Sequence, residues 1–211
     1  MHPINRNHFF AEIIAVIAFA LMLAQSAIGS VPTSDREVWK GYSQEQKQLA
    51  IAGFADCYRS ASGEKEVFAL TDLVATGHLV DVALSHAEEN QFGSLILQSL
   101  KNAPTVKPDV HAEHWNGPTG FHSGLWWRGI EDRDRQAYVQ GVVWCAKVLN
   151  TVTISTPVLS VQQVVEKLNG WYVISDDDWS DPRSNARVDV SAIGAMQRLE
   201  ILRIKRAAGK K

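Results

Sequence analysis

The chain has 211 residues, of which 45% are hydrophobic and 21% are charged, with 14 Gly, 7 Pro and only 2 Cys. This composition is that of a folded protein, and it excludes collagen-like, disordered, disulfide-rich and multi-span membrane proteins. The formal net charge is −2, from 21 basic and 23 acidic residues. The charge balance therefore favours neither a nucleic-acid-binding protein nor a polyanionic tail.

The first part of the chain, residues 1–29, predicts a secretory signal peptide. An uncharged apolar run covers 13–24, Arg6 lies before it, and small residues follow it. This order is typical of exported proteins. As a helix the run reaches about 18 Å, which is shorter than the ~30 Å hydrocarbon core of a bilayer. We therefore expect cleavage near 27–30, no stable membrane span afterwards, and a periplasmic or secreted location; an uncleaved N-terminal anchor is the alternative.

Two segments of the chain match each other at a constant spacing of 88 residues. Trp39, Gly41, Gln48, Gly53 and Cys57 have identical counterparts in Trp127, Gly129, Gln136, Gly141 and Cys145. Self-similarity at a fixed spacing is typical of a repeated structural unit. The sequence therefore predicts an internal duplication.

Each copy of the repeat predicts a helix. In the first copy, Ser43 and Gln46 fit a capping box at the start of the helix, and Gly53 and Cys57 lie four residues apart on one helical face. A glycine inside a helix costs about 0.8–1 kcal/mol relative to alanine. Glycines at matching positions therefore predict that another helix crosses closely over Gly53 and over Gly141. The alternative is a helix that is merely weakened in each copy.

The rest of the chain is also broadly helical. Further helices are expected over 64–75, 78–89 and 91–101, from 131 or 132 through the second copy, from about 161 to a stop at 169–170, and over 190–206. Two β-prone stretches, 151–156 and 171–175, allow one minor β-ribbon. The predicted fold class is all-α, with two related helical units at 36–103 and 122–206 joined by an irregular connection at 104–121.

The two cysteines occupy equivalent positions in the repeat. A two-fold packing of the repeated helices would bring Cys57 and Cys145 within reach of a disulfide, which an exported protein retains. The alternative is two separately buried thiols that act as small hydrophobic side chains. No cation is placed to lower the pKa of either thiol, so neither is predicted to be a nucleophile.

Three histidines lie in or next to the connection. His111, His114 and His122, with a carboxylate from Asp109 or Glu113, would bind zinc with one open position, as in metal-dependent hydrolases. The spacing matches no metalloprotease motif, so structural or exposed histidines and no cofactor are the first expectation.

Aromatic residues in loops predict a contact surface. These residues are Trp115, Phe121 and Trp126 near the connection, and Trp179 with Asp177 in an acidic loop. The acidic segment 176–181 lacks the glycine and the glutamate of an EF-hand, so a partner-binding loop is the simpler interpretation.

The repeated Trp-x-Gly…Gln…Gly-x-x-x-Cys pattern, at 39–57 and 127–145, resembles small exported bacterial helical proteins of unassigned role. It is also similar to the periplasmic immunity proteins that neutralise type VI secretion amidase effectors. This chain lacks the Cys-x-Pro element of that group, and its length and duplication differ. The resemblance implies a non-catalytic helical binding protein of the bacterial envelope, and it transfers no residue-level site.

Three functions follow as hypotheses. The first is an exported, non-catalytic, all-helical binding or immunity/inhibitor-type protein whose partner is another protein and not a nucleic acid. The second is a metal-dependent hydrolase built on His111, His114 and His122. The third is an envelope scaffold that forms a homodimer through the repeated helix faces.

Overall fold

The computed structural model describes residues 34–63, 68, 71–85, 91–106, 122–149, 161–173 and 181–208. Within these ranges the chain is all-α, as predicted, and its only β-type pairings are isolated bridges between Thr71 and Thr105 and between Ser123 and Arg187. The helices are α2 (Asp35–Lys40), α3 (Gln44–Ser62), α4 (Leu73–Leu84), α5 (Phe92–Asn102), α6 (Gly124–Gly129), α7 (Asp132–Val148), α8 (Val161–Trp171) and α9 (Val188–Ala208). The predicted signal peptide, the β-prone stretch 151–156 and most of the connection lie outside the described residues.

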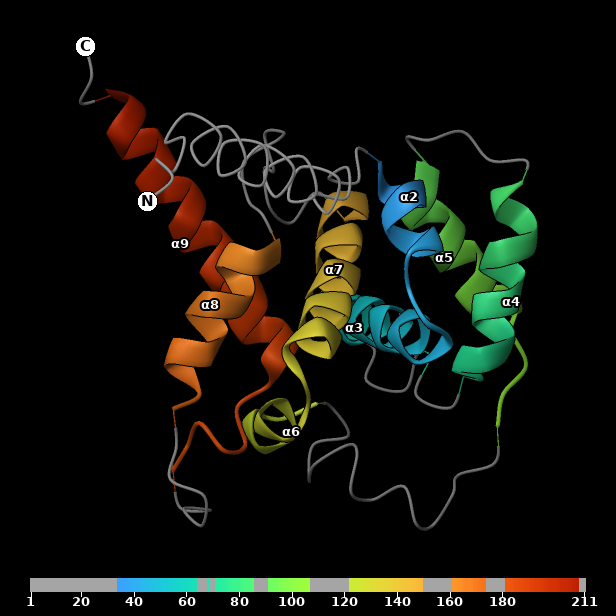
Figure 1. The fold of residues 1–211 in the computed structure, drawn as a ribbon, viewed down its shortest axis with the longest axis horizontal. Coiled ribbons are helices and arrows are strands. Elements are labelled where there is room, and N and C mark those ends of the chain that lie inside the picture. The colour runs from blue at the N-terminus through green and yellow to red at the C-terminus, as the bar shows by residue number, and fades with distance from the viewer. Residues whose placement is uncertain are drawn as a thin grey trace, which may run out of the picture.

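Two helices, α3 and α7, cross at the centre of the molecule (Figure 1). The pair α4 and α5 covers one side of this crossing, and the pair α8 and α9 covers the other (Figure 1). The short helices α2 and α6 each precede one of the central helices in the chain. The order short helix, central helix, outer pair therefore occurs twice.

The crossing of α3 and α7 is closest at the two predicted glycines. A Cβ atom at Gly53 would overlap the backbone carbonyl of Tyr138, and a Cβ atom at Gly141 would overlap the backbone carbonyl of Ala50. Tyr138 follows Ala50 by the repeat spacing of 88 residues, so the two glycines make the same contact with the roles of the helices exchanged. The predicted close crossing is confirmed, and it explains why both helices tolerate an interior glycine.

The cysteines of the repeat join the same two helices. Cys57 and Cys145 form a disulfide with their Cα atoms 6.2 Å apart, within the ordinary range for such bonds. Both residues are completely buried. The disulfide therefore holds α3 against α7 inside the core.

The tryptophans of the repeat are anchored by matching contacts. Trp39 is completely buried, its indole N–H donates to Asp81 over 2.7 Å, and the ammonium of Lys47 lies 5.3 Å from the ring centre and 2.9 Å from the same carboxylate. A cation over an indole face is favourable, and here the carboxylate orients it.

The second copy repeats this arrangement with different side chains. Trp127 is 1% exposed, its indole N–H donates to Asn169 over 2.9 Å, and the guanidinium of Arg135 lies 5.6 Å from the ring centre and 3.3 Å from the Asn169 oxygen. Each of these residues follows its counterpart in the first copy by 88 positions.

Several predicted helix boundaries need correction. The capping box of Ser43 and Gln46 is confirmed. In the described part of 64–89, however, a single helix, α4, begins after Asp72, whose carboxylate accepts from the backbone N–H of Ala75. The last helix begins at Val188 rather than at residue 190.

The predicted stop of α8 at 169–170 is also wrong, because the helix continues to Trp171. Trp171 is therefore helical and does not begin a strand. Leu168 is buried and Asn169 accepts from Trp127, so tertiary contacts hold these residues in the helix against the local preference of Asn-Gly to end it.

Candidate functional site

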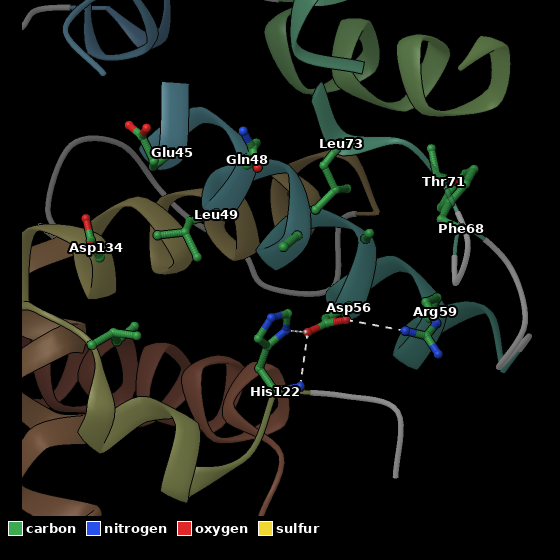
Figure 2. A pocket seen from close by; sticks show the side chains of 13 residues that line it. Glu45, Gln48, Leu49, Asp56, Arg59, Phe68, Thr71, Leu73, His122 and Asp134 are labelled. Carbon is green, nitrogen blue, oxygen red and sulfur yellow. Dashed lines mark hydrogen bonds and ion pairs between the residues drawn. The ribbon is translucent and has the colours of Figure 1, made fainter. Parts of the chain in front are cut away.

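A cavity of about 530 Å³ lies along one face of α3 (Figure 2). The residues of α3 that line it recur every three or four positions and form a stripe along the helix: Glu45, Gln48, Leu49, Ala52, Ala55, Asp56 and Arg59. Leu73 and Ile130 contribute apolar surface, and His122 lies at the floor (Figure 2). The cavity therefore combines apolar walls with a polar floor.

Asp56 is the centre of the polar floor. Its side chain accepts hydrogen bonds from His122 Nδ1 over 2.6 Å and from the Tyr138 hydroxyl over 2.7 Å, and the Arg59 guanidinium lies 3.5 Å from its other oxygen. Asp56 is 4% exposed, Arg59 is 9% exposed and Tyr138 is completely buried. A buried carboxylate with three donors around it is fully paired and has a fixed orientation.

The electrostatics keep Asp56 ionised. Burial by itself raises the pKa of Asp56, but the hydrogen bond and charge of His122, the hydroxyl of Tyr138 and the charge of Arg59 outweigh burial, so the pKa lies below its usual value. Burial, with the nearby charge of Asp56, raises the pKa of Tyr138 well above its usual value. The tyrosine therefore stays protonated and donates to the carboxylate.

The imidazole of His122 is held rigidly beside this carboxylate. Its ring packs 4.2 Å from the Trp126 ring and 5.1 Å from the Tyr138 ring, measured between centres. Since Nδ1 lies against an ionised carboxylate, we assign a proton to Nδ1. Within the described part of the chain Nε2 has no hydrogen-bond partner, and the ring borders the cavity (Figure 2). Nε2 is thus placed to accept a hydrogen bond, take up a proton or bind a metal.

The corresponding positions of the second copy carry no such group. Trp144 stands 88 residues after Asp56, is completely buried, and packs with its ring centre 4.6 Å from that of Phe92. Ala50 and Ser34 stand at the positions that correspond to Tyr138 and His122. Since Trp144 stands where the first copy has Asp56, this position of the helix does not require a carboxylate. Burying a charged carboxylate there costs free energy that a tryptophan does not.

Of the eight residues predicted to form the contact surface or the metal site, six lie outside the described residues: His111, His114, Trp115, Phe121, Asp177 and Trp179. Among the residues that are described, no three metal-ligating side chains come together. His122 lies at the cavity floor, and the structure pairs it with Asp56 on α3.

Trp126, predicted as part of an exposed contact surface, is only 9% exposed. Its ring packs against those of His122 and Tyr138, with centres 4.2 and 5.0 Å away. The Trp126 ring therefore packs against the imidazole of His122 and helps to hold it in place. The sequence pattern around Trp126 did not predict this, because its contact with Tyr138 of α7 depends on how the chain folds back between the two residues.

Sequence reasoning missed Asp56, Arg59 and Tyr138. One signal was present: Asp56 is the only charged residue in the otherwise apolar stretch 49–57. An ionisable side chain on the buried face of a helix needs partners, and such groups cluster at functional sites. The partners themselves come from distant parts of the chain, so their identity needed the tertiary structure.

None of the described helices combines the length and the apolar character that a bilayer span requires. No family model, curated protein or solved structure matches the chain.

Proposed function

We propose that this chain is an exported, non-catalytic binding protein and that its ligand site is the cavity along α3. The observation that carries this proposal is the buried Asp56–His122 pair, which holds one edge of an imidazole at the floor of a cavity of about 530 Å³. Cavities of a few hundred Å³ with apolar walls and a few fixed polar groups are typical ligand sites.

Export is part of the proposal and has two supports. The apolar run at 13–24 has the pattern of a signal peptide. The Cys57–Cys145 disulfide is a bond that persists in oxidising compartments. An immunity or inhibitor role, with the 104–121 connection and the 176–181 loop as protein contacts, is the form of binding that the sequence resemblance favours.

The two-unit origin by internal duplication is likewise a proposal. It is supported by the identical pairs at a spacing of 88 residues and by the glycine and tryptophan contacts that recur at that spacing. In this view one unit kept an apolar filling at Trp144, and the other acquired the polar floor at Asp56.

The non-catalytic part of the proposal rests on the lining of the cavity. Its described lining contains one hydroxyl side chain, Thr71, and no thiol, since both cysteines are in the disulfide. The homodimer through the repeated helix faces is the less favoured alternative, because the faces around Gly53 and Gly141 pack on each other within one chain.

A hydrolase is a second candidate function, and the Nδ1 contact of His122 favours it. A carboxylate on one imidazole nitrogen orients the other as a general base or as a metal ligand. His111 and His114 would complete the zinc site of this candidate. Protein purified without a chelator or an affinity tag would then contain stoichiometric zinc by elemental analysis.

The binding proposal is tested by narrowing the cavity with residues that the second copy already carries. The double variant Ala52→Gln, Ala55→Val introduces the side chains found at positions 140 and 143. We expect fragments from a chemically diverse library to raise the unfolding temperature of the natural protein and not that of the double variant. Val82→Gln, on the exposed face of α4, is the matched control and should bind as the natural protein does. Fragments that stabilise all three proteins equally would contradict the proposal.

A further inference from the structure

The lining of the cavity along α3 indicates the chemical class of its ligand, and this inference rests on the proposed function. We infer that the cavity binds a neutral, largely apolar molecule with one hydroxyl group, and that this hydroxyl donates a hydrogen bond to Nε2 of His122. Three features support it: small side chains that open the cavity, charges that are paired within the protein, and one accessible nitrogen at the floor.

The cavity is open because α3 carries small side chains where α7 carries larger ones. Ala52 and Ala55 border the cavity. At the corresponding positions of the second copy, Gln140 and Val143 are 8% and 7% exposed. An apolar cavity of about 150 Å³ holds a benzene molecule, so the cavity along α3, at about 530 Å³, has room for a molecule of about two or three rings.

The walls above the floor are apolar. They are formed by partly buried side chains that also pack against the core: Leu49, Phe68, Leu73 and Ile130. Removing apolar surface from water is favourable, and the gain grows with the area that a ligand covers. The walls therefore favour a ligand whose body is apolar.

The charged side chains around the cavity have partners within the protein. At the floor, the Arg59 guanidinium lies 3.5 Å from the carboxylate of Asp56. At the rim, the pKa of Glu45 is lowered by its own backbone N–H first and also by the charge of Arg133, which in turn lies 3.9 Å from Asp134. A charged ligand would meet charges of both signs at either end and would lose its hydration. A neutral ligand avoids this cost.

One nitrogen at the floor is open to the cavity. Nδ1 of His122 lies 2.6 Å from Asp56, which leaves Nε2 on the other side of the ring (Figure 2). In the part of the chain that the structure describes, the buried side-chain polar atoms without a partner are the indole nitrogens of Trp126 and Trp144, and Nε2 is not among them. With the proton on Nδ1, Nε2 of the neutral ring has a lone pair and accepts a hydrogen bond. A hydroxyl group supplies the donor without adding a charge.

Water is the simpler occupant of a cavity with a polar floor. A bound water would satisfy Nε2 as a hydroxyl group does. It would leave the apolar walls at Leu49, Leu73 and Ile130 in contact with solvent. An apolar molecule with a hydroxyl group satisfies both the floor and the walls, so we favour it over water.

Four naphthalene derivatives test the inference: 2-naphthol, 2-methoxynaphthalene, 2-naphthoate and 2-naphthylmethylammonium. The first offers a hydrogen-bond donor, the second offers only an acceptor, and the last two are charged. Binding is measured by equilibrium dialysis at neutral pH with the disulfide intact. We expect 2-naphthol to bind and each charged compound to bind at least about tenfold more weakly, because its charge must be desolvated.

The variant His122→Asn tests the hydroxyl contact. An asparagine amide lies about as far along the side chain as Nδ1, so the variant keeps a donor for Asp56 and removes Nε2. We expect the preference for 2-naphthol over 2-methoxynaphthalene to be about threefold to tenfold greater in the natural protein than in His122→Asn, as for one neutral hydrogen bond. His78→Asn, at an exposed position of α4, is the matched control and should leave this preference unchanged.

Nuclear magnetic resonance gives a readout that does not depend on a variant. In protein with isotope-labelled histidine, the ring nitrogen signals distinguish a protonated nitrogen from one with a lone pair. We expect Nδ1 of His122 to be protonated and Nε2 to have the lone pair at neutral pH. The Nε2 signal should shift when 2-naphthol is added and not when 2-methoxynaphthalene is added. A protonated Nε2 would overturn the inference.

The outcomes separate the inference from the proposed function. An equal preference in the natural protein and in His122→Asn overturns the inference, as does tighter binding of either charged compound. Absence of 2-naphthol binding overturns it too, and in all these cases the proposed function stands if library fragments still depend on an open cavity. If neither the naphthalene compounds nor the fragments bind in a way that Ala52→Gln, Ala55→Val abolishes, the proposed function fails as well.

Discussion

Asp56 shows how one buried carboxylate organises residues from separate elements. Its hydrogen-bond donors come from α3 itself, from the residue that precedes the α6 cap, and from the middle of α7. Each donor offsets part of the cost of burying the charge. The same carboxylate fixes which nitrogen of His122 carries a proton and which one borders the cavity.

Asp56→Asn should therefore destabilise the protein. An amide cannot accept from His122, Tyr138 and Arg59 together, because its NH₂ group must face at least one of these donors. We expect the free energy of unfolding, measured by urea denaturation at neutral pH, to fall by about 2–4 kcal/mol. Asp134→Asn, at the mouth of the cavity, should change it by less than about 1 kcal/mol. A similar small loss for Asp56→Asn would mean that the network is not formed.

The stability difference between the natural protein and Asp56→Asn should depend on pH with a defined sign. The pKa of Asp56 is lowered by folding, so its contribution is complete above the unfolded-state pKa of about 3.9 and is lost as the pH falls through the folded-state pKa. Asp189, whose pKa is raised by burial, contributes to the pH dependence of stability with the opposite sign. It is present in both proteins, so its contribution cancels in the difference between them. We expect the stability difference between the natural protein and Asp56→Asn to be constant near neutral pH and to shrink below about pH 4. A difference that grew on acidification would contradict this assignment.

At the scale of the elements, the crossing of α3 and α7 depends on the absence of two side chains. A methyl group at Gly53 or Gly141 meets backbone rather than a movable side chain, so the helices must separate. We expect Gly53→Ala and Gly141→Ala each to lower the free energy of unfolding by about 3 kcal/mol or more. Gly194→Ala, in α9 where a methyl group meets nothing within 4 Å, is the control and should be neutral or stabilising by up to about 1 kcal/mol. Equal effects at all three positions would show that the crossing is looser than described.

The tryptophan anchors offer a second test between elements. Asn169 accepts from Trp127 as Asp81 accepts from Trp39, so an amide is sufficient in one copy. Asp81→Asn should consequently cost less than about 1 kcal/mol, since the Lys47 contact lies near the surface. Asp81→Leu leaves a buried indole N–H without its acceptor and should cost about 1–3 kcal/mol in chemical denaturation. A larger loss of stability for Asp81→Asn than for Asp81→Leu would mean that the ion pair with Lys47, and not the indole hydrogen bond, provides most of the stabilisation.

Across the fold as a whole, the disulfide closes a loop that runs from the end of α3 through α4, α5 and α6 into the second half of α7. Cys57 and Cys145 are 88 residues apart, and both lie in the central helices. Loops of this length give a cross-link about 3–5 kcal/mol of stabilisation, chiefly by restricting the unfolded chain. We expect Cys57→Ala, Cys145→Ala to lower the free energy of unfolding by this amount. A reductant should destabilise the natural protein similarly and leave the double variant unchanged.

The helical class, the start of α3 at Ser43 and the close crossing at both glycines were predictable from the sequence. Capping pairs and a glycine inside an amphipathic helix are patterns of one or two turns, and the matching segments 88 residues apart are visible in the sequence itself. The start of α4 and the end of α8 were predicted less well. At the end of α8, burial of Leu168 and the hydrogen bond that Asn169 accepts override the local preference to end the helix.

The candidate site depends on contacts between residues far apart in the chain. Asp56 and His122 are 66 residues apart, and Asp56 and Tyr138 are 82 apart, so no local pattern joins them. The packing of α7 on α3 removes these side chains from water, and a charge removed from water must find donors wherever the fold supplies them. The matching segments predicted which helices meet, but the candidate site lies at positions where these segments differ, and those positions come together only when the helices pack.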